Sequence, residues 1–131
     1  MRLVLDASAA IEVVLSRNKA VAFTQALGDA DEVLAPDLFV AEVVNTVWKY
    51  HQFESLDLSA CDRALEQALS LIDALVPCKE LYREAFLLAR SARRPAYDMF
   101  YLSLARREDA AFLTTDSALK KEASRQGIRT L

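Results

Sequence analysis

Four acidic residues in this sequence lie among apolar ones. Asp6 and Asp116 each directly follow a short, largely apolar run, and Asp98 is followed by a mostly apolar segment. Glu42 is the only acid in the segment 38–47. Carboxylates gathered in apolar surroundings repel one another, so their charge requires compensation. Their oxygen atoms suit a hard divalent cation such as Mg²⁺ or Mn²⁺.

Each of the four acids also has a simpler structural explanation. Asp6 and Asp116 precede expected helices, where an Asp caps the helix and contributes about 1 kcal/mol. Asp98 lies in the first turn of an expected helix, where negative charge interacts favourably with the helix dipole. Glu42 could face solvent. The combination of all four, rather than any single acid, favours a metal site.

The segments around these acids alternate between strand and helix patterns. Short apolar runs predict strands at 3–5, 32–36, 75–78, 111–115 and 128–131. Apolar residues at helical spacing predict helices at 8–15, 19–27, 37–53, 58–75, 79–92, 95–109 and 117–126. Tight hairpin signals such as Asn-Gly are absent. The alternation therefore predicts one α/β domain over residues 1–131, a three-layer α/β/α sandwich with a mostly parallel central sheet.

Four residues are expected to mark the ends of these elements. Asp37 and Ser59 are expected N-caps of the helices that begin beside them, and Gly28 is expected to end the helix that precedes it. Pro77 weakens the short strand that contains it. With only two Gly and three Pro, the chain has little room for long loops.

Parallel strands would bring the acids together. In an open parallel sheet, ligands bind beyond the carboxyl ends of the strands. Asp6 and Asp116 each follow a strand, so both are expected at this edge despite their separation in sequence. Asp98 lies near the start of its helix, so its charge is expected at the same end of the domain. Glu42 lies one turn into the helix after the strand at 32–36. The sequence therefore predicts one acidic site at one edge of the sheet.

The overall composition is that of a globular protein. Of the 131 residues, 53% are hydrophobic and 27% are charged, which excludes a disordered chain. The net charge of −3 excludes a generally basic nucleic-acid binder, so a polyanion would need a local basic patch or a metal ion. Cys61 and Cys78 are far apart without a neighbouring His, which argues against zinc. With no signal peptide or membrane span apparent, we expect a cytoplasmic protein.

Four stretches of the sequence resemble the acidic motifs of a known family. LVLDASAAI, LAPDLFVAEVVNTVWKY, RPAYDMFYLSLARR and FLTTDSAL are similar, in order and in spacing, to the four motifs of PIN-domain ribonucleases. The resemblance spans the whole chain, whose length is close to that of the VapC toxins of bacterial VapBC toxin–antitoxin pairs. It implies a PIN-like fold and a toxin that is an endoribonuclease dependent on Mg²⁺ or Mn²⁺.

The resemblance also implies roles for individual residues and for partners. Carried over position by position, it implies a metal-binding catalytic cluster of Asp6, Glu42, Asp98 and Asp116. Ser8 matches a small hydroxyl residue that supports or caps in such proteins, and Thr115 is assigned a similar supporting role. The family further implies a homodimer, an RNA substrate and a VapB-like antitoxin that inserts a segment across the active-site groove.

The chemistry that this cluster suits is hydrolysis of a phosphodiester bond. Asp6, Asp98 and Asp116 would hold an ion that acidifies a bound water and shields the phosphate charge. Glu42 suits either orienting the attacking water or bridging a second ion, and the sequence leaves both open. In-line attack, as the resemblance implies, gives a 3′-hydroxyl and a 5′-phosphate.

Binding of RNA also requires positive charge near the acids. The candidates are basic residues close to the acids in sequence: Arg93, Arg94, Lys120 and Lys49. The pair Arg93–Arg94 is favoured because the nearby Pro95 and Asp98 tie it to the edge that carries the acids. Arg106 and Arg107 lie further along the same helix, so we expect them at the opposite end.

Two other classes of protein are weighed against the nuclease. A receiver-like signalling domain also gathers acids around Mg²⁺, but it needs a phospho-accepting Asp after a central strand and a Lys after the last strand. The strand at 75–78 supplies no such Asp, and no Lys follows the strand at 128–131. A catalytically inactive PIN-like binding module is the remaining alternative, and the presence of all four acids argues against it.

Overall fold

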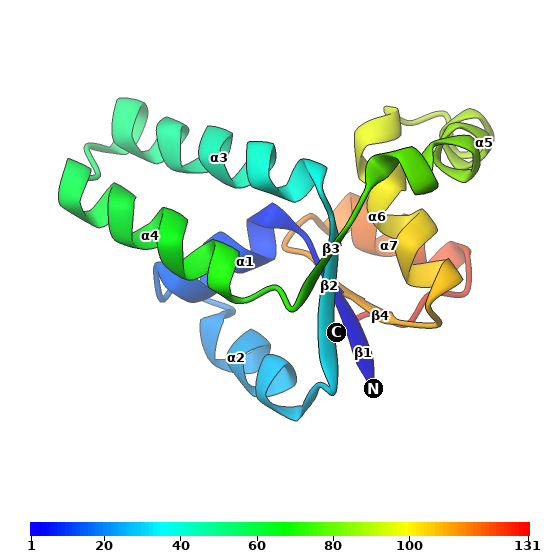
Figure 1. Ribbon diagram of the computed structural model, residues 1–131, viewed down its shortest axis with the longest axis horizontal. Coiled ribbons are helices and arrows are strands. Elements are labelled where there is room, and N and C mark those ends of the chain that lie inside the picture. The colour runs from blue at the N-terminus through cyan, green and yellow to red at the C-terminus, as the bar shows by residue number, and fades with distance from the viewer.

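The computed structural model describes residues 1–131, and at its centre lies a sheet of four parallel strands (Figure 1). The strands are β1 (Arg2–Leu5), β2 (Glu32–Pro36), β3 (Ala74–Val76) and β4 (Ala111–Leu113). Their order across the sheet is β3-β2-β1-β4, which places β1 and β2 in the interior. Parallel neighbours need long crossover connections, which the intervening helices provide.

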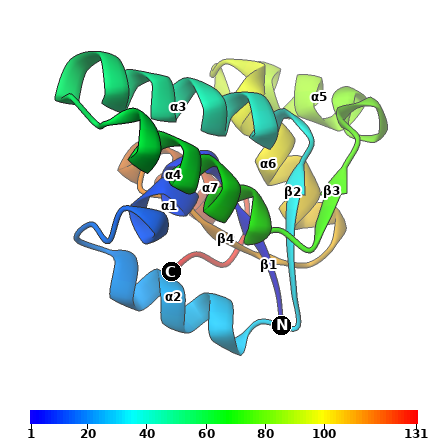
Figure 2. The same cartoon turned by 60° about the vertical axis from the view of Figure 1, so that its left-hand side comes forward.

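Seven α-helices and one short 3₁₀ helix, Cys78–Glu80, connect and cover the strands. The α-helices are α1 (Ala7–Val14), α2 (Ala20–Asp29), α3 (Leu38–Glu54), α4 (Leu58–Ser70), α5 (Tyr82–Ala92), α6 (Ala96–Arg107) and α7 (Ser117–Arg125). Figure 1 shows α1 to α4 on one side of the sheet and α5 to α7 on the other, and Figure 2 shows the long pair α3 and α4 lying side by side. The predicted α/β/α sandwich with a parallel sheet is confirmed. None of the helices is both long and apolar enough to cross a membrane.

The sheet and α6 form the centre of the hydrophobic core. Leu3, Val4 and Leu5 of β1 are fully buried, because helices cover both faces of the sheet. Helix α6 packs against β1, β2 and β4, and half of its residues are buried. This packing therefore keeps the segments that carry Asp6 and Asp98 rigid.

The register of β1 and β4 aligns the residues that follow these two strands. Leu5 pairs with Leu113, so Asp6 and Thr114 emerge together at the carboxyl edge of the sheet. The Asp6 amide continues the pairing by donating to the Leu113 carbonyl oxygen at 3.2 Å. Backbone hydrogen bonds thus fix Asp6 where the strand becomes a helix.

One predicted helix end and two predicted capping bonds are wrong. Gly28 lies inside α2, and its backbone is not left-handed. Asp37 makes no capping bond, because its carboxylate accepts a hydrogen bond from the Cys78 amide at 3.0 Å and joins the ends of β2 and β3. Asp57, rather than Ser59, caps α4. The local preferences of Asp37 and Ser59 were overridden by a tertiary contact and by a neighbouring Asp.

The outer parts of the sheet are shorter than predicted. Strand β3 ends at Val76, immediately before Pro77, which lacks the amide hydrogen that a ladder requires. The strand expected at 128–131 is reduced to one bridge between Phe112 and Thr130. The regular sheet therefore ends at β4 on this side.

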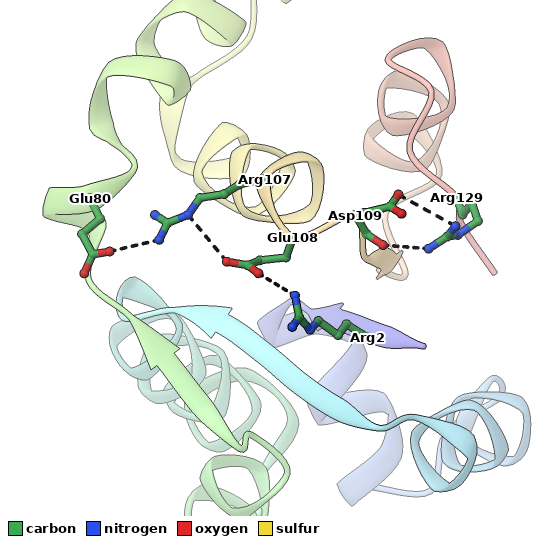
Figure 3. A network of polar contacts seen from close by, with 6 residues as sticks. All are labelled: Arg2, Glu80, Arg107, Glu108, Asp109 and Arg129. Atoms are coloured by element: carbon green, nitrogen blue, oxygen red, sulfur yellow. Dashed lines mark hydrogen bonds and ion pairs between the residues drawn. The ribbon is translucent and has the colours of Figure 1, made fainter.

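A chain of ion pairs lies at the start of β1 (Figure 3). Arg2 pairs with Glu108 at 2.8 Å, and Arg107 lies between Glu108 and Glu80, at 3.6 and 3.2 Å. These side chains are partly exposed, so each pair contributes little to stability. Arg107 is engaged at this end of the sheet, away from the edge that carries Asp6, as its position along the helix predicts.

Replacing Asp57 by Ala is expected to lower the free energy of unfolding by about 1 kcal/mol. The Asp57 carboxylate accepts the Ala60 amide hydrogen bond at 2.7 Å, and alanine leaves that amide at the start of α4 without a protein partner. Asp57→Asn keeps a capping oxygen and should lose much less. Urea denaturation measures both variants, and an equal loss in the two would contradict the capping role.

Candidate active site

All four predicted acids line one cavity of about 480 Å³ at the carboxyl edge of the sheet. Asp6 follows β1, Asp116 follows β4, Glu42 projects from α3, and Asp98 projects from the first turn of α6. Residues far apart in the sequence are thus brought together, as the parallel strands predict. The other lining residues are Ala7, Ser8, Leu38, Ala41, Asn45, Thr46, Lys49, Tyr97, Tyr101 and Leu119.

Asp6 is the most deeply buried of the four acids, at 7% exposed. It caps α1, and its Oδ1 accepts hydrogen bonds from the Ala9 amide at 2.9 Å and from Ser8 Oγ at 2.7 Å. Burial raises the pKa of Asp6 to about 6, against the opposing effect of the Thr114 and Ser8 hydroxyls and the Ala9 amide. The negative charge of Asp98 adds to the rise. Asp6 is therefore a rigid carboxylate whose charge is poorly solvated.

Asp116 caps α7 in the way that Asp6 caps α1. Its Oδ1 accepts hydrogen bonds from the Ala118 amide at 3.0 Å and the Leu119 amide at 3.1 Å, and its side chain is exposed. Capping and a place in the cavity are therefore compatible. At both positions one oxygen fixes the start of a helix while the carboxylate faces the site.

Hydroxyl groups connect Asp6 to Asp116 across the end of the sheet. Ser8 Oγ, which donates to Asp6, accepts a hydrogen bond from the Thr115 amide at 3.1 Å. Thr114 Oγ1 lies 3.4 Å from Ser8 Oγ and accepts from the Asp116 amide at 3.1 Å. The hydroxyl that joins this network is thus that of the buried Thr114, whereas Thr115 contributes its amide. Thr114 was not predicted, although it follows β4 as Asp6 follows β1.

Asp98 is half-buried on α6 and pairs with the residue one turn earlier. Arg94 Nη2 lies 3.6 Å from Asp98 Oδ2. Burial raises the pKa of Asp98; Arg94 opposes the rise, and the negative charge of Asp116 adds to it. Arg94 Nε is buried without a hydrogen-bond partner. Arg94 is therefore the protein's own counter-ion for Asp98.

Glu42 is half-buried on α3 and receives one side-chain hydrogen bond. Tyr101 of α6 donates its hydroxyl to Glu42 Oε1 at 2.6 Å. Burial raises the pKa of Glu42; the Tyr101 hydrogen bond opposes the rise, and the negative charges of Asp98 and Asp6 add to it. Burial and the charge of Glu42 raise the pKa of Tyr101 far above its usual range, so its hydroxyl stays protonated. Tyr101 was not predicted, because an aromatic residue on an apolar helix is typical of a core.

The donor set suits a hard cation in its chemistry. Asp6, Glu42 and Asp116 each accept their hydrogen bonds on a single oxygen, which leaves the second oxygen free to bind a ligand. Carboxylate oxygens are the ligands that Mg²⁺ and Mn²⁺ prefer, and a cation would relieve the mutual repulsion of the acids. As placed, no three Asp, Glu, His or Cys side chains converge closely enough to hold one ion. Coordination by three carboxylates therefore requires side-chain rotation within the cavity.

One of the four predicted RNA-binding residues lines the cavity. This residue is Lys49, which projects from α3. Arg94 is engaged with Asp98, Arg93 is exposed at the end of α5, and Lys120 is half-buried on α7 outside the cavity lining. Lys49 and Arg94 are therefore the predicted cations that lie at the cavity or against one of its acids.

Several known proteins are similar to this chain. Ribonuclease VapC3 of Pyrobaculum aerophilum is 29% identical over 124 residues, which cover 93% of this chain and 95% of the relative. Among solved structures, PAE2754 from P. aerophilum has a TM-score of 0.70 at 20% identity and covers 99% of this chain and 83% of its own. VapBC2 from Rickettsia felis was solved bound to a DNA fragment from the promoter of its own genes. It has a TM-score of 0.68 at 16% identity and covers 100% of this chain and 98% of its own. These structures share the fold.

The sequence also matches a known domain family. The match is to the PIN domain, and it covers residues 3–123. That range contains all four acids of the cavity and every strand and helix of the sandwich except the first residue of β1 and the last two residues of α7. The chain belongs to the PIN domain family.

Proposed function

We propose that this PIN-domain protein is a metal-dependent endoribonuclease that acts in the cytoplasm as the toxin of a type II toxin–antitoxin system, with residues 1–131 forming one nuclease domain. The observation that carries the proposal is that four acids from separate elements line one cavity at the carboxyl edge of the sheet. The similarity to a protein named Ribonuclease VapC3 over 93% of the chain supports the ribonuclease assignment. The all-oxygen donor set supports Mg²⁺ or Mn²⁺ as the cofactor.

The acids have distinct roles in the proposed hydrolysis. Asp6, Asp98 and Asp116 would hold the ion, which would supply an acidified water molecule and shield the phosphate charge. Ser8 and the backbone amide of Ala9 keep Asp6 Oδ1 fixed, so that Asp6 stays in place during the reaction. The hydrogen bond from the Asp116 amide to Thr114, and the bond from the Thr115 amide to Ser8, tie Asp116 to the same rigid unit.

Glu42 has a separate role at the edge of the cluster. It lies on α3 and accepts from Tyr101 on Oε1 alone, which leaves Oε2 to accept a hydrogen bond from the attacking water and so orient it. The water oxygen forms the new bond to phosphorus in line with the departing 3′-oxygen of the ribose. The bond to that oxygen breaks, the attacking water releases one proton to solvent, and the departing oxygen takes one proton from solvent to become a 3′-hydroxyl, while the phosphate stays on the 5′ side.

Lys49 is proposed to contact the RNA backbone. It lines the cavity from α3, two turns beyond Glu42, and its side chain is exposed. Lys49→Ala is expected to raise KM several-fold with little change in kcat, and to lower the slope of log affinity against log salt by about 1. Lys19→Ala, which removes an exposed lysine outside the cavity lining, is the matched control. Equal effects of the two substitutions in filter-binding titrations would contradict this role.

We also propose a homodimer and a VapB-like antitoxin as partners of this protein. The likeness to VapBC2 from R. felis is one support. The second is exposed apolar surface on two helices: Trp48 and Phe53 on α3 are 50% and 73% exposed, and Phe86 and Leu87 on α5 are 64% and 57% exposed. Exposed apolar side chains that gather on a helix are typical of interaction surfaces.

Cleavage of a structured RNA tests the nuclease assignment. The protein is incubated with the RNA in Mg²⁺ or Mn²⁺, with and without EDTA, and the ends of the fragments are mapped. We expect cleavage that requires the ion and leaves 3′-hydroxyl and 5′-phosphate ends. Cleavage that persists in EDTA, or none with either ion, would overturn the proposal. RNA binding without cleavage would favour the inactive PIN-like binding module, which the separation of the acids as placed also fits.

A further inference from the structure

Tyr101 lines the cavity without belonging to the acidic cluster. It lies on α6 one turn after Asp98 and is 1% exposed. Its ring packs against Phe112 of β4, with 6.2 Å between the ring centroids. Its hydroxyl reaches across to α3 and donates to Glu42 Oε1 at 2.6 Å. Tyr101 thus joins the two helices that carry Glu42 and Asp98.

We propose that Tyr101 is a positioning residue that holds the Glu42 carboxylate in the cavity and directs its second oxygen toward the substrate. The inference deepens the proposed ribonuclease function and rests on it. The hydroxyl of Tyr101 is the only group that hydrogen-bonds the Glu42 side chain. The other hydrogen bond at this residue, from Thr46 Oγ1 at 2.8 Å, goes to the Glu42 backbone oxygen and leaves the carboxylate free to rotate.

The two side chains differ in how firmly each is held. Glu42 is half-buried at the cavity, and a glutamate has three rotatable side-chain bonds, so its carboxylate can swing toward solvent. Tyr101 has two such bonds, and its ring is fixed between α6 and the sheet. The rigid donor therefore selects one position of the flexible acceptor.

The constraint also acts in the opposite direction. A buried tyrosine hydroxyl needs a hydrogen-bond acceptor, and Glu42 is the only acceptor that Tyr101 has. If Glu42 rotated out of the cavity, it would leave that hydroxyl buried and unpaired, which is unfavourable. The Tyr101 hydroxyl thus disfavours every Glu42 conformer that leaves the site.

Tyr101→Phe tests this role because it removes the hydroxyl and keeps the buried ring. We expect kcat for RNA cleavage to fall about tenfold while KM stays unchanged, since a hydrogen bond to a charged group is lost away from the RNA-binding cations. In a metal-free crystal structure of the variant, Glu42 should occupy more than one conformer while the rest of the cavity keeps its geometry. This second readout does not depend on activity.

Tyr50→Phe is the matched control. Tyr50 lies on α3, the helix of Glu42, and its hydroxyl makes no hydrogen bond; Arg17 contacts its ring, 5.3 Å from the centroid. The same chemical change there should leave kcat and the Glu42 conformation unaltered. Glu42→Asp is a second test, since its shorter side chain keeps the charge but withdraws it from Tyr101, and it should show the same kcat defect.

A double-mutant cycle separates positioning from a general structural role. In a Glu42→Ala background, Tyr101→Phe should have no further effect on kcat, because the group that it positions is gone. Multiplicative effects of the two substitutions, or an unchanged kcat in Tyr101→Phe with a single Glu42 conformer, would overturn the inference. If the wild-type protein cleaves RNA and these tests fail, only the role of Tyr101 is lost. If the wild-type protein does not cleave, the proposed function itself fails.

Discussion

Asp6→Asn is expected to lower kcat for RNA cleavage by about 10³-fold or more, because it removes the buried carboxylate on which the proposed metal site is centred. Asp6 is 7% exposed, and packing together with the hydrogen bonds to its Oδ1 fixes it at the end of β1. An asparagine can still cap α1, so the fold should be retained. Single-turnover cleavage of a labelled RNA at saturating Mn²⁺ gives the rate.

The matched control for this experiment is Asp57→Asn. Asp57 also caps a helix through a hydrogen bond to a backbone amide, but it lies at the start of α4 and outside the cavity lining. The same substitution there should leave the cleavage rate within about twofold of wild type. A cleavage rate in Asp6→Asn that matches that of Asp57→Asn would contradict the assignment of Asp6 to the active site.

Asp6→Asn should also change how the stability of the metal-free protein depends on pH. The free energy of unfolding of Asp6→Asn minus that of wild type should be about 3 kcal/mol larger at neutral pH than at acid pH. Burial raises the pKa of Asp6 from its usual value of 3.8 to about 6. Between these two values the folded protein holds a proton that the unfolded chain has released. Unfolding therefore becomes easier as the pH rises through this interval, and asparagine abolishes this contribution.

Urea denaturation in EDTA, from about pH 2 to about pH 7, measures this difference. The free energy of unfolding of wild type should fall relative to that of Asp6→Asn as the pH rises. Asp37→Asn provides a contrast of opposite sign, because hydrogen bonds from the thiol and the backbone amide of Cys78 lower the pKa of Asp37. The stability that Asp37 contributes is present above its usual pKa and is lost as the pH falls below it. A constant difference between wild type and Asp6→Asn across the range would contradict the burial of an ionised Asp6.

The parallel sheet and its acidic edge were predictable from the sequence because local patterns determine both. The run Leu3–Leu5 predicts a buried strand, and an acid directly after such a strand lies at the carboxyl edge whatever the rest of the chain does. Asp6 and Asp116 needed no tertiary information beyond parallel pairing, which the alternation of strands and helices indicates. Their place in one cavity follows from the sheet order.

The partners of the acids could not be predicted, because they depend on which side chains meet across elements. Tyr101 contacts Glu42 only because α6 and α3 both reach the end of the sheet, and no spacing rule links residues on different helices. Thr114 is buried beside Ser8 because of the pairing register of β1 and β4, which the sequence left undetermined.

Two other residues have partners that the sequence did not predict. Asp37 was expected to cap a helix, but the amide of Cys78, brought close by the pairing of β2 and β3, takes its carboxylate. Arg94 was expected to face RNA, and the structure pairs it with Asp98 one helical turn away. Both contacts depend on how the elements meet in the folded chain.

Location of Mn²⁺ in crystals of the protein tests the central claim most directly. Crystals soaked in Mn²⁺ are measured at a wavelength where manganese scatters anomalously, and peaks in the anomalous map give the positions of the ions. The account predicts an ion in the cavity bound by the carboxylates of Asp6, Asp98 and Asp116, with the Asp98 side chain rotated away from Arg94. Manganese bound only elsewhere, or none in the cavity at a concentration that supports RNA cleavage, would contradict it.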